Sequence, residues 1–281
     1  MRVRECKNEI VRILTEADIE SAFLEASIFI RKATSWTKVQ ELMNDKEELA
    51  FEIAEKAISM ARERAKHIPT SYITGEKEFY GLNFFVSPNC LIPRPDTETL
   101  VETGLEAIKA YDYHTVLDMC TGSGAIAIAI KANAQVDVTA VDISEKALAI
   151  AKLNAETLLD EKIHFIQSNL FENVKGSFDL IVSNPPYVTQ KWYDEVEEEV
   201  KKEPLLALID YAEDGLDIIR KIIKDCKAHL NEGGTLAFEC DYRQTESLKE
   251  LLNIAGFSET EIIYDLNNKP RVVKGRLCTQ S

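Results

Sequence analysis

Hydrophobic and polar positions follow a helical period through the first quarter of the chain. Apolar residues recur at the spacing of a single buried helix face. Two stripes stand out: Ile10, Ile13 and Leu14, and then Ala22, Phe23, Ala26, Phe29 and Ile30. No glycine or proline interrupts this pattern before Pro69, and Asp45 can cap a long helix that runs toward Lys66. We therefore predict an all-helical bundle over residues 1–74.

A different pattern begins after Pro69 and Gly75, which mark a boundary. The stretch Glu78–Val86 alternates between apolar and polar residues and is rich in aromatic rings, so we predict a β-hairpin within a linker over residues 75–95. The chain is thus expected to consist of a helical part, this linker and a larger domain over residues 96–281.

Two prolines hold the next segment, residues 92–98, in an extended conformation. Asp96 or Thr97 can then cap the helix that follows. Two interpretations of the segment remain open at this point. It is either a rigid linker or a lid over a ligand, in which Arg94 is available to bind a carboxylate.

From residue 113 onward, short β-prone runs alternate with helical patterns. The predicted strands are Thr115–Met119, Val136–Val141, Ile163–Gln167, Leu180–Ser183 and Thr235–Glu239. The predicted helices are Ala125–Ala132, Glu145–Leu158, Gly215–Leu230 and Thr245–Ala255. This order predicts an α/β fold with a doubly wound, Rossmann-like, mainly parallel sheet. The segments Glu259–Tyr264 and Arg271–Leu277 are expected to add a C-terminal antiparallel hairpin.

Composition narrows the classes of function. The 281 residues include 48 acidic and 33 basic side chains, and a net charge of −15 argues against broad binding to nucleic acid. No apolar run approaches the roughly 18 residues of a membrane span, and the start lacks an apolar signal core, so a cytoplasmic protein is expected. The six cysteines and four histidines are scattered, which predicts neither a disulfide framework nor a metal site. The acidic run Glu195–Glu199 is expected to be a solvated helix face.

A candidate cofactor site follows the first strand of the large domain. Its loop, Cys120-Thr121-Gly122-Ser123-Gly124, brings backbone close to a ligand before a helix N-terminus. Asp142 ends the second strand, where an acid can accept both hydroxyls of a ribose. Asp118 precedes the loop and would repel a pyrophosphate, which favours a cofactor with a cationic end, such as S-adenosylmethionine. Alternatively, Asp118 only caps the loop, and Asn169 after the third strand is either an adenine contact or a turn residue.

A candidate acceptor site ends the fourth strand, at Asn184-Pro185-Pro186-Tyr187. The prolines cannot continue a β-ladder, because they lack backbone N–H groups. The side-chain oxygen of Asn184 and the carbonyl of Pro185 can accept both N–H bonds of a planar NH₂ group, and Tyr187 can pack against its flat face. Such a group is a poor nucleophile, so catalysis by this turn would consist mainly of positioning. The simpler interpretation is a turn that only ends the strand.

Taken together, these motifs resemble the family of protein-(glutamine-N5) methyltransferases that modify bacterial class I peptide-chain release factors. The resemblance covers most of the chain. It is carried by the helical N-terminal region and by the segments Ile92–Glu98, Asp118–Ala127, Asp142–Ser144, Val182–Tyr187, Glu203-Pro204 with Ala207-Leu208, Asp214–Leu216, and Gly233-Gly234 with Glu239.

The resemblance implies a methyltransferase that uses S-adenosyl-L-methionine, bound by Cys120–Gly124, Asp142, Asn184 and the Asn169-Leu170 turn. It implies that Asn184, Pro185, Pro186 and Tyr187 hold the glutamine amide of a Gly-Gly-Gln loop, and that the helical region helps to dock the release factor. We expect a monomer. The chain departs from the family pattern at four places, which are Cys120 for glycine, Asp96 for glutamate, Asn169-Leu170 for an acid-led turn, and Asp241 for glycine.

Two other functions stay open from the sequence. The catalytic turn also suits an amine methyltransferase that acts on adenine or guanine in DNA or RNA, although the chain lacks a basic segment. A binding module that kept the fold without catalysis is the other alternative, and the intact Asn184–Tyr187 turn and Asp142 argue against it.

Overall fold

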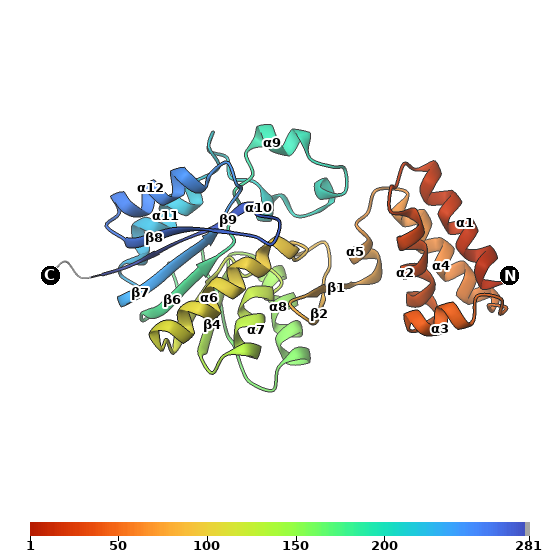
Figure 1. Ribbon diagram of the computed structural model, residues 1–281, viewed down its shortest axis with the longest axis horizontal. Coiled ribbons are helices and arrows are strands. Elements are labelled where there is room, and N and C mark those ends of the chain that lie inside the picture. The colour runs from red at the N-terminus through yellow and green to blue at the C-terminus, as the bar shows by residue number, and fades with distance from the viewer. Residues whose placement is uncertain (279–281) are drawn as a thin grey trace. The chain divides into compact units, whose positions relative to one another are not determined.

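The computed structural model describes residues 1–278. The chain forms two compact units (Figure 1). The first comprises Met1–Glu76 together with a short segment, Glu197–Lys202, and the second comprises Lys77–Val196 and the chain from Glu203 onward. None of the helices within residues 1–278 has the length and apolar character that a membrane crossing requires.

The first unit is a helical bundle in which α1, α2 and α4 pack against one another. Its helices are α1 (Val3–Glu16), α2 (Ala22–Thr34), α3 (Lys38–Met43), α4 (Phe51–Arg64), α5 (Thr70–Thr74) and the 3₁₀ turn η2 (Val200–Lys202). Ile10, Leu14, Phe29 and Ile30 are fully buried in its core, as their spacing predicts. Phe23 was expected in the same stripe, but it is 73% exposed, so that part of the prediction is wrong.

The expected helix cap at Asp45 is also wrong. The helix α4 begins at Phe51, and its N-cap residue, Ala50, has no side chain that could bond the first turn. Asp45 instead contacts the start of α1, where its carboxylate lies 3.2 Å from the Arg4 guanidinium and its carbonyl accepts the Arg4 N–H. The Asp45 side chain therefore forms an ion pair with Arg4, which is distant in sequence, instead of capping a helix.

The acidic run also differs from its prediction as a solvated helix face. The helix α9 (Gln190–Glu195) ends where the run begins, and the residues after it are irregular. The Glu199 carboxylate lies 2.8 Å from the guanidinium of Arg64, which also donates to Glu25 at 2.8 Å. Glu25 is 7% exposed, so this arginine neutralises a buried acid as well as a partly exposed one.

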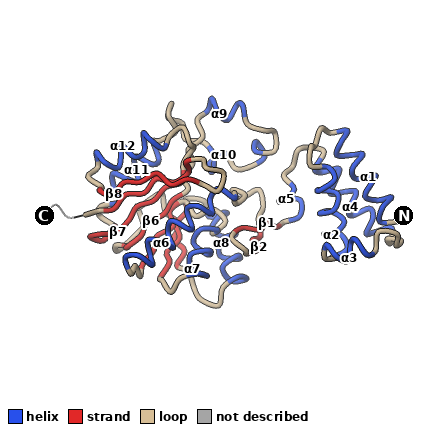
Figure 2. Tube along the Cα trace, viewed as in Figure 1, coloured by secondary structure: helices blue, strands red, loops and turns tan. Residues whose placement is uncertain are grey.

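The second unit contains a seven-stranded mixed sheet in the order β5-β4-β3-β6-β7-β9-β8, drawn in red in Figure 2. Its strands are β3 (Thr115–Met119), β4 (Asp137–Asp142), β5 (His164–Gln167), β6 (Phe178–Ser183), β7 (Leu230–Glu239), β8 (Ser258–Tyr264) and β9 (Pro270–Arg276). Strands β3 to β7 are parallel, while β9 runs antiparallel to both β7 and β8. The predicted doubly wound α/β fold with a C-terminal hairpin is confirmed.

Helices cover both faces of this sheet and bury a separate core on each (Figures 1 and 2). They are α6 (Glu98–Tyr111), α7 (Ala125–Asn133), α8 (Glu145–Leu158), α11 (Asp217–Cys226) and α12 (Thr245–Ile254), while the short helix α10 (Leu205–Leu208) lies in the connection between β6 and α11. Alternate residues of one strand point to opposite faces. In β6, Leu180 and Val182 join the core beneath α6 and α7, whereas Ile181 joins the core of α11 and α12.

A short two-stranded sheet precedes α6, formed by β1 (Glu76–Phe79) and β2 (Leu82–Phe85). A 3₁₀ turn, η1 (Pro95–Thr97), then leads into the helix. Neither Asp96 nor Thr97 caps α6 with its side chain, so that expectation is wrong. Both side chains instead bind partners that are distant in sequence. Asp96 pairs with Arg271 at 2.7 Å, and the Thr97 hydroxyl accepts a hydrogen bond from the Asn184 amide.

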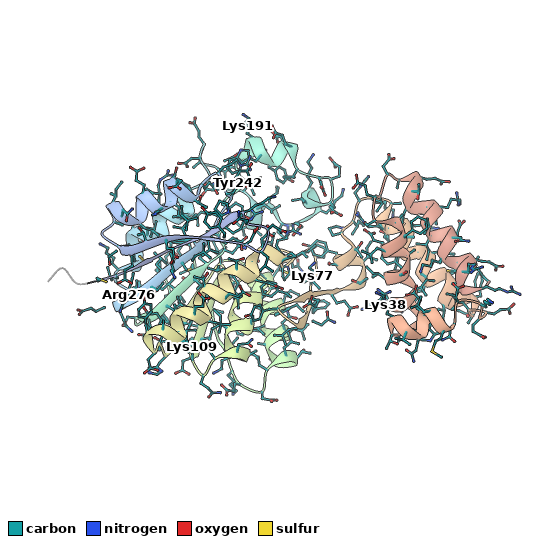
Figure 3. The ribbon with its side chains drawn as sticks, in the orientation of Figure 1. Lys38, Lys77, Lys109, Lys191, Tyr242 and Arg276 are labelled. Carbon is teal, nitrogen blue, oxygen red and sulfur yellow. The ribbon has the colours of Figure 1, made fainter. Side chains whose placement is uncertain are left out.

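The helix α9 follows the Asn184–Tyr187 turn and is anchored by an aromatic contact. The Arg243 guanidinium lies 3.6 Å from the ring centroid of Trp192 in α9. Figure 3 shows the neighbours of these two residues, Lys191 and Tyr242, close together in the same part of the second unit. Cation–π contacts of this kind contribute about 0.5–1 kcal/mol at exposed sites. The chain after β7 therefore helps to hold the segment that follows the turn.

Substituting Arg64 with alanine tests the buried charges of the first unit. Loss of the guanidinium leaves Glu25 buried without its cationic partner, so we expect the free energy of unfolding to fall by about 3–5 kcal/mol. Urea unfolding followed by circular dichroism measures this loss. Arg12→Ala is the matched control, because Arg12 pairs with Glu9 and Glu16 on an exposed helix face and its removal should leave stability nearly unchanged. Equal effects of the two substitutions would contradict the assignment.

Candidate active site

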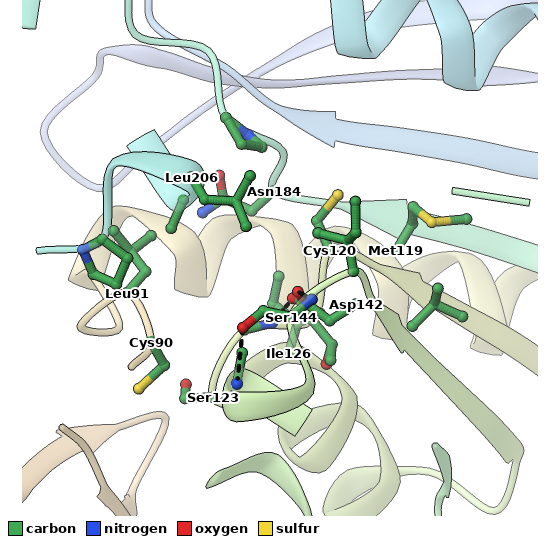
Figure 4. Close-up of a pocket in the computed structure, with 18 of the residues that line it drawn as sticks. Cys90, Leu91, Met119, Cys120, Ser123, Ile126, Asp142, Ser144, Asn184 and Leu206 are labelled. Atoms are coloured by element: carbon green, nitrogen blue, oxygen red, sulfur yellow. Dashed lines mark hydrogen bonds between the residues drawn. The ribbon is translucent and has the colours of Figure 1, made fainter. Parts of the chain in front are cut away.

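A cavity of about 310 Å³ opens where β3, β4 and β6 end, and these strands are neighbours in the sheet. Carboxyl ends of parallel strands meet at one edge, which is where open α/β sheets bind ligands. The lining includes Arg94, Thr97, Cys120, Thr121, Gly122, Ser123, Asp142, Asn169, Leu170, Asn184, Pro186, Leu206 and Ala207. In Figure 4, Asp142 and Ser144 lie on one side of the cavity, and Asn184 and Leu206 lie on the other.

The loop after β3 has an unusual backbone. Cys120, Gly122 and Gly124 all have positive φ, at 64°, 57° and 81°. A side chain at Gly124 would also crowd α8, since a Cβ there would lie 3.1 Å from Ala151. Cys120 therefore occupies a left-handed position that glycine adopts without strain and that costs other residues about 1–3 kcal/mol. Burial raises the pKa of its thiol far above the usual value, which keeps the sulfur uncharged.

Asn154, which the sequence patterns did not single out, supports this loop from α8. Its side-chain amide donates to the carbonyls of Ser123 at 2.9 Å and Phe85 at 3.0 Å, and it accepts the Phe85 N–H at 2.8 Å. The side chain is 1% exposed. One buried amide thus ties β2 to the loop, and a lone asparagine inside a helical pattern gives no sequence signal for such a role.

Asp142 uses both carboxylate oxygens to hold the backbone around the cavity. One oxygen accepts the Gly122 N–H and the other accepts the Ser144 N–H, both at 2.8 Å. Each oxygen has a further lone pair, so the carboxylate can still accept hydroxyl protons from a ligand. Burial raises the pKa of Asp142, while these two N–H groups lower it.

Asp118 lies behind the loop and is not among the residues that line the cavity. One of its oxygens accepts the Thr121 hydroxyl at 2.6 Å and the Ala127 N–H at 3.1 Å, so it stabilises the loop and the start of α7. The other oxygen, Oδ1, is buried and has no hydrogen-bond partner among residues 1–278. Burial raises the pKa of Asp118 to about 7. The hydrogen bonds of the first oxygen fit a residue that caps the loop. The unpartnered Oδ1 fits a residue that attracts a cationic cofactor, so both interpretations stay open.

The turn after β5 places Asn169 and Leu170 in the lining of the cavity. The Asn169 amide donates to Glu172 at 2.7 Å within the turn, and Leu170 has a positive φ of 49°. The apolar Leu170 and Ile218 both line the cavity, where they can contact a flat ring. A role for Asn169 at an adenine edge stays a prediction.

The Asn184–Tyr187 turn is fixed to its neighbours by several hydrogen bonds. Just before the turn, the Ser183 hydroxyl donates to the Met119 carbonyl at 2.7 Å and joins the ends of β6 and β3. The Asn184 amide donates to the Thr97 hydroxyl at 3.3 Å, and the Tyr187 hydroxyl donates to Glu239 at 3.4 Å. Asn184 and Pro186 line the cavity, whereas Pro185 and Tyr187 are not among the lining residues. The substrate contacts expected of the latter two stay predictions.

Gly215 and Gln244 hold the turn from behind, and the sequence patterns did not assign them this role. The Gln244 amide donates to the carbonyls of Tyr187 at 3.0 Å and Asp214 at 2.7 Å. Gly215 has φ +69°, and a Cβ there would overlap the Tyr187 carbonyl oxygen. Glycine is therefore required at this position by close packing against the turn, which explains the Asp214–Leu216 motif in physical terms.

Arg94, the residue expected in a lid, lines the cavity and pairs with Glu203. Glu203 is 4% exposed and also accepts the Ile92 N–H at 2.9 Å. The guanidinium is thus held by a carboxylate of the protein itself. The Glu203-Pro204 motif joins the extended segment before α6 to the chain before α10, and the lid function of Arg94 stays a prediction.

Comparisons with known proteins show which families this chain resembles. A family model described as the PrmC N-terminal domain matches residues 5–75, and one described as the methyltransferase small domain matches residues 97–204. The release factor glutamine methyltransferase of Deinococcus radiodurans is 34% identical over 278 residues, which cover 98% of this chain and 99% of that protein. The release factor glutamine methyltransferase of Clostridium botulinum is 37% identical over 270 residues, which cover 94% of this chain and 95% of that protein.

A solved methyltransferase from Pyrococcus furiosus is similar in fold, with a TM-score of 0.54 at 19% identity over 72% of this chain and 92% of that one. Likeness at that identity supports the fold alone. The two curated relatives, at 34% and 37% identity, extend over nearly the whole chain, and they confirm the resemblance seen in the motifs. The chain therefore belongs to the family of release factor glutamine methyltransferases.

Proposed function

We propose that this protein transfers a methyl group from S-adenosyl-L-methionine to the side-chain amide nitrogen of the glutamine in the Gly-Gly-Gln motif of class I peptide-chain release factors. The observation that carries the proposal is that Asp142 and Asn184 line one cavity, with the glycine-rich loop between the strands that bear them. Asp142, expected to bind the donor, and Asn184, expected to bind the acceptor, thus share one cavity.

The residues around β3 and β4 fit the methyl donor. Asp142 keeps acceptor lone pairs for the two ribose hydroxyls, while Leu170 and Ile218 offer apolar surface for the adenine. The buried Oδ1 of Asp118 has no partner among the described residues, and the ionised form of this carboxyl would favour a cationic ligand next to the loop. When bound, the donor supplies an electrophilic methyl group on a sulfonium. The protein binds it, orients it and keeps water out.

The Asn184–Tyr187 turn fits the acceptor. The Asn184 oxygen and the Pro185 carbonyl would accept the two N–H bonds of the glutamine amide, with Pro186 and Tyr187 beside its flat face. Holding the nitrogen in line with the methyl group provides most of the acceleration, because well-oriented reactants avoid the entropic cost of meeting. The amide nitrogen becomes acidic as it is methylated, so a strong base is not required.

The helical first unit would recognise the release factor. Several large apolar side chains of its helices are exposed, including Phe23, Leu42, Met43 and Phe51, all at 68–79%. Exposed aromatic and methionine side chains of this kind are typical of protein interfaces. In this proposal the enzyme works as a monomer in the cytoplasm, where peptide release takes place.

Direct assay is the first test. Incubation of the protein with S-adenosylmethionine and a class I release factor should add one methyl group to the Gly-Gly-Gln glutamine. Mass spectrometry of the digested peptide locates the modification. DNA and RNA are offered in the same mixture as competitors. Methylation of adenine or guanine with none on the release factor would instead support a nucleic-acid methyltransferase.

Asn184→Ala is expected to abolish the positioning of the acceptor without disturbing the donor. The kcat should fall by about 100-fold or more, as it does when reacting groups are misplaced by about 1 Å. Asn184 is only one of several residues expected to contact the donor, so the Kd for S-adenosylmethionine, measured by calorimetry, should change less than about threefold. Unchanged turnover would refute the role of Asn184.

Asp142→Ala is expected to weaken binding of the donor. Its carboxylate is expected to bond the ribose, and hydrogen bonds to a charged group contribute about 1.5–3 kcal/mol, so the Kd for the donor should rise at least about tenfold. Calorimetry with the purified protein measures this change. Wild-type affinity would show that the donor binds elsewhere.

A further inference from the structure

Gln244, at the N-terminal end of α12, bonds the backbone of two segments that are distant in sequence. Its amide nitrogen, Nε2, donates to the carbonyls of Asp214 at 2.7 Å, Tyr187 at 3.0 Å and Gly215 at 3.3 Å. Its oxygen, Oε1, accepts the N–H of Asp241 at 3.1 Å. The residue is 3% exposed, so water does not compete for these contacts.

These partners fix the orientation of the Gln244 amide. A carbonyl oxygen can only accept a hydrogen bond, and a backbone N–H can only donate one. A half rotation of the amide would place Oε1 against three carbonyl oxygens and Nε2 against the Asp241 N–H. The nitrogen and oxygen are therefore assigned by their partners, and the position requires a side chain that donates.

The packing around this amide leaves little free space. Gly215 lies between Gln244 and the Asn184–Tyr187 turn. A Cβ at position 215 would lie 2.6 Å from Nε2 and would overlap the Tyr187 carbonyl oxygen. Groups packed this closely move together, because protein interiors have few voids. A displacement of the Gln244 amide is therefore expected to shift the Tyr187 peptide.

The Tyr187 peptide closes the turn that would hold the acceptor. Pro185 and Pro186 have no N–H with which to anchor this part of the backbone. Beyond them, the Val188 N–H donates to a carbonyl of α10 at 2.9 Å. Gln244 bonds the carbonyl between these points, so a side chain of a distant segment sets the path of the backbone at the end of the turn.

We propose that Gln244 is a positioning residue of the methyl transfer, which fixes the Asn184–Tyr187 turn so that its two acceptor oxygens meet the glutamine amide in line with the donor. This inference rests on the proposed function and deepens it. Gln244 is not among the residues that line the cavity, so it acts through the turn. Placement matters in such a reaction, because an error of about 1 Å can cost about 100-fold in rate.

The chain around Gln244 is itself braced. The Asp241 carboxylate accepts the Arg243 N–H at 3.0 Å and pairs with the guanidinium at 2.6 Å. That guanidinium lies 3.6 Å from the ring centroid of Trp192 in α9. Residues 241–244 therefore contact both ends of the segment 187–192. The chain departs from the family pattern at Asp241, and a glycine there could not bond the Arg243 side chain.

Substitution of Gln244 with glutamate keeps the shape of the side chain and removes both protons. The carboxylate would face three carbonyls without a donor, so kcat with S-adenosylmethionine and a saturating class I release factor should fall by about 100-fold at pH 8. Gln244→Met removes the donors without adding charge and should lower kcat by about tenfold. In both variants the Kd for S-adenosylmethionine and the KM for the release factor should stay near the wild-type values, because donor binding and docking use other residues.

Three controls separate positioning from damage to the fold. The stoichiometry of donor binding in calorimetry gives the concentration of folded enzyme, and kcat is expressed per folded molecule. Asn154→Asp makes the same change of amide to acid at a buried residue that bonds the Ser123 carbonyl in the loop after β3, so it should raise the Kd for S-adenosylmethionine more than it lowers kcat. Gln190→Glu makes the change at an exposed position of α9 and should alter neither quantity.

A double variant tests whether Gln244 acts through the turn. If it does, Gln244→Glu combined with Asn184→Ala should lower kcat by much less than the product of the two single losses, because the side chain to be positioned is already gone. Losses that multiply would show that Gln244 acts independently of Asn184, and they would overturn the proposal.

The remaining outcomes are distinct. A wild-type enzyme that adds no methyl group to glutamine contradicts the proposed function itself. Wild-type methylation with unchanged kcat in both Gln244→Glu and Gln244→Met overturns only the positioning role. A rise in the Kd for S-adenosylmethionine in parallel with the loss of kcat also overturns it. Gln244 would then support the cavity through Asp214 and Gly215, which precede α11 and its cavity residue Ile218.

Discussion

Pro185 and Pro186 cannot donate backbone hydrogen bonds, so β6 ends at Ser183 and the polar groups beyond it must find partners outside the sheet ladder. Those partners come from three directions. Thr97 meets the Asn184 side chain, Gln244 meets the Tyr187 carbonyl, and the chain after Glu203 pairs with the residues that follow the turn. The shape of this turn thus depends on tertiary contacts that the two prolines make necessary.

The loop after β3 depends on a different constraint. Its backbone passes through left-handed conformations three times in five residues, at Cys120, Gly122 and Gly124. Within the loop, the Gly122 N–H donates to Asp142 and the Thr121 hydroxyl donates to Asp118, which also accepts the Ala127 N–H at the start of α7. Cys120 is the strained member of the loop, because its Cβ occupies a region that suits glycine. The strain is local, and the hydrogen bonds of the two aspartates hold the loop in spite of it.

Local patterns were sufficient to predict most of the second unit. The strand at Thr115–Met119 and the helix at Glu145–Leu158 have the predicted bounds, because alternation and helical spacing are properties of the local sequence. The failures at Asp45, Thr97 and Glu199 share one cause. Each is a polar side chain that local rules assign to a cap or to solvent, and each has a partner distant in sequence, namely Arg4, Asn184 and Arg64.

In the candidate site, as in the fold, features set by the local sequence could be predicted and contacts between distant residues could not. The positions of Asp142 and Asn184 at strand ends could be predicted, since parallel strands bring their carboxyl ends to one edge. The contacts of Asn154, Gly215 and Gln244 could not be predicted, because each residue contacts backbone atoms of a distant segment. A backbone atom can belong to any residue type, so such a contact does not show in the sequence pattern. The motifs that resemble the family pointed to Gly215 without giving its physical reason.

The turn alone does not distinguish a glutamine amide from the exocyclic amine of a nucleobase. Both are planar NH₂ groups with a delocalised lone pair, and an acceptor oxygen at Asn184 suits either. Selection must come from the surroundings. A net charge of −15 disfavours a phosphate backbone near the protein. Leu206 lines the cavity and is 59% exposed, which gives the opening an apolar side chain suited to a peptide. The chemistry of the turn and the character of its surroundings together favour an amide on a protein.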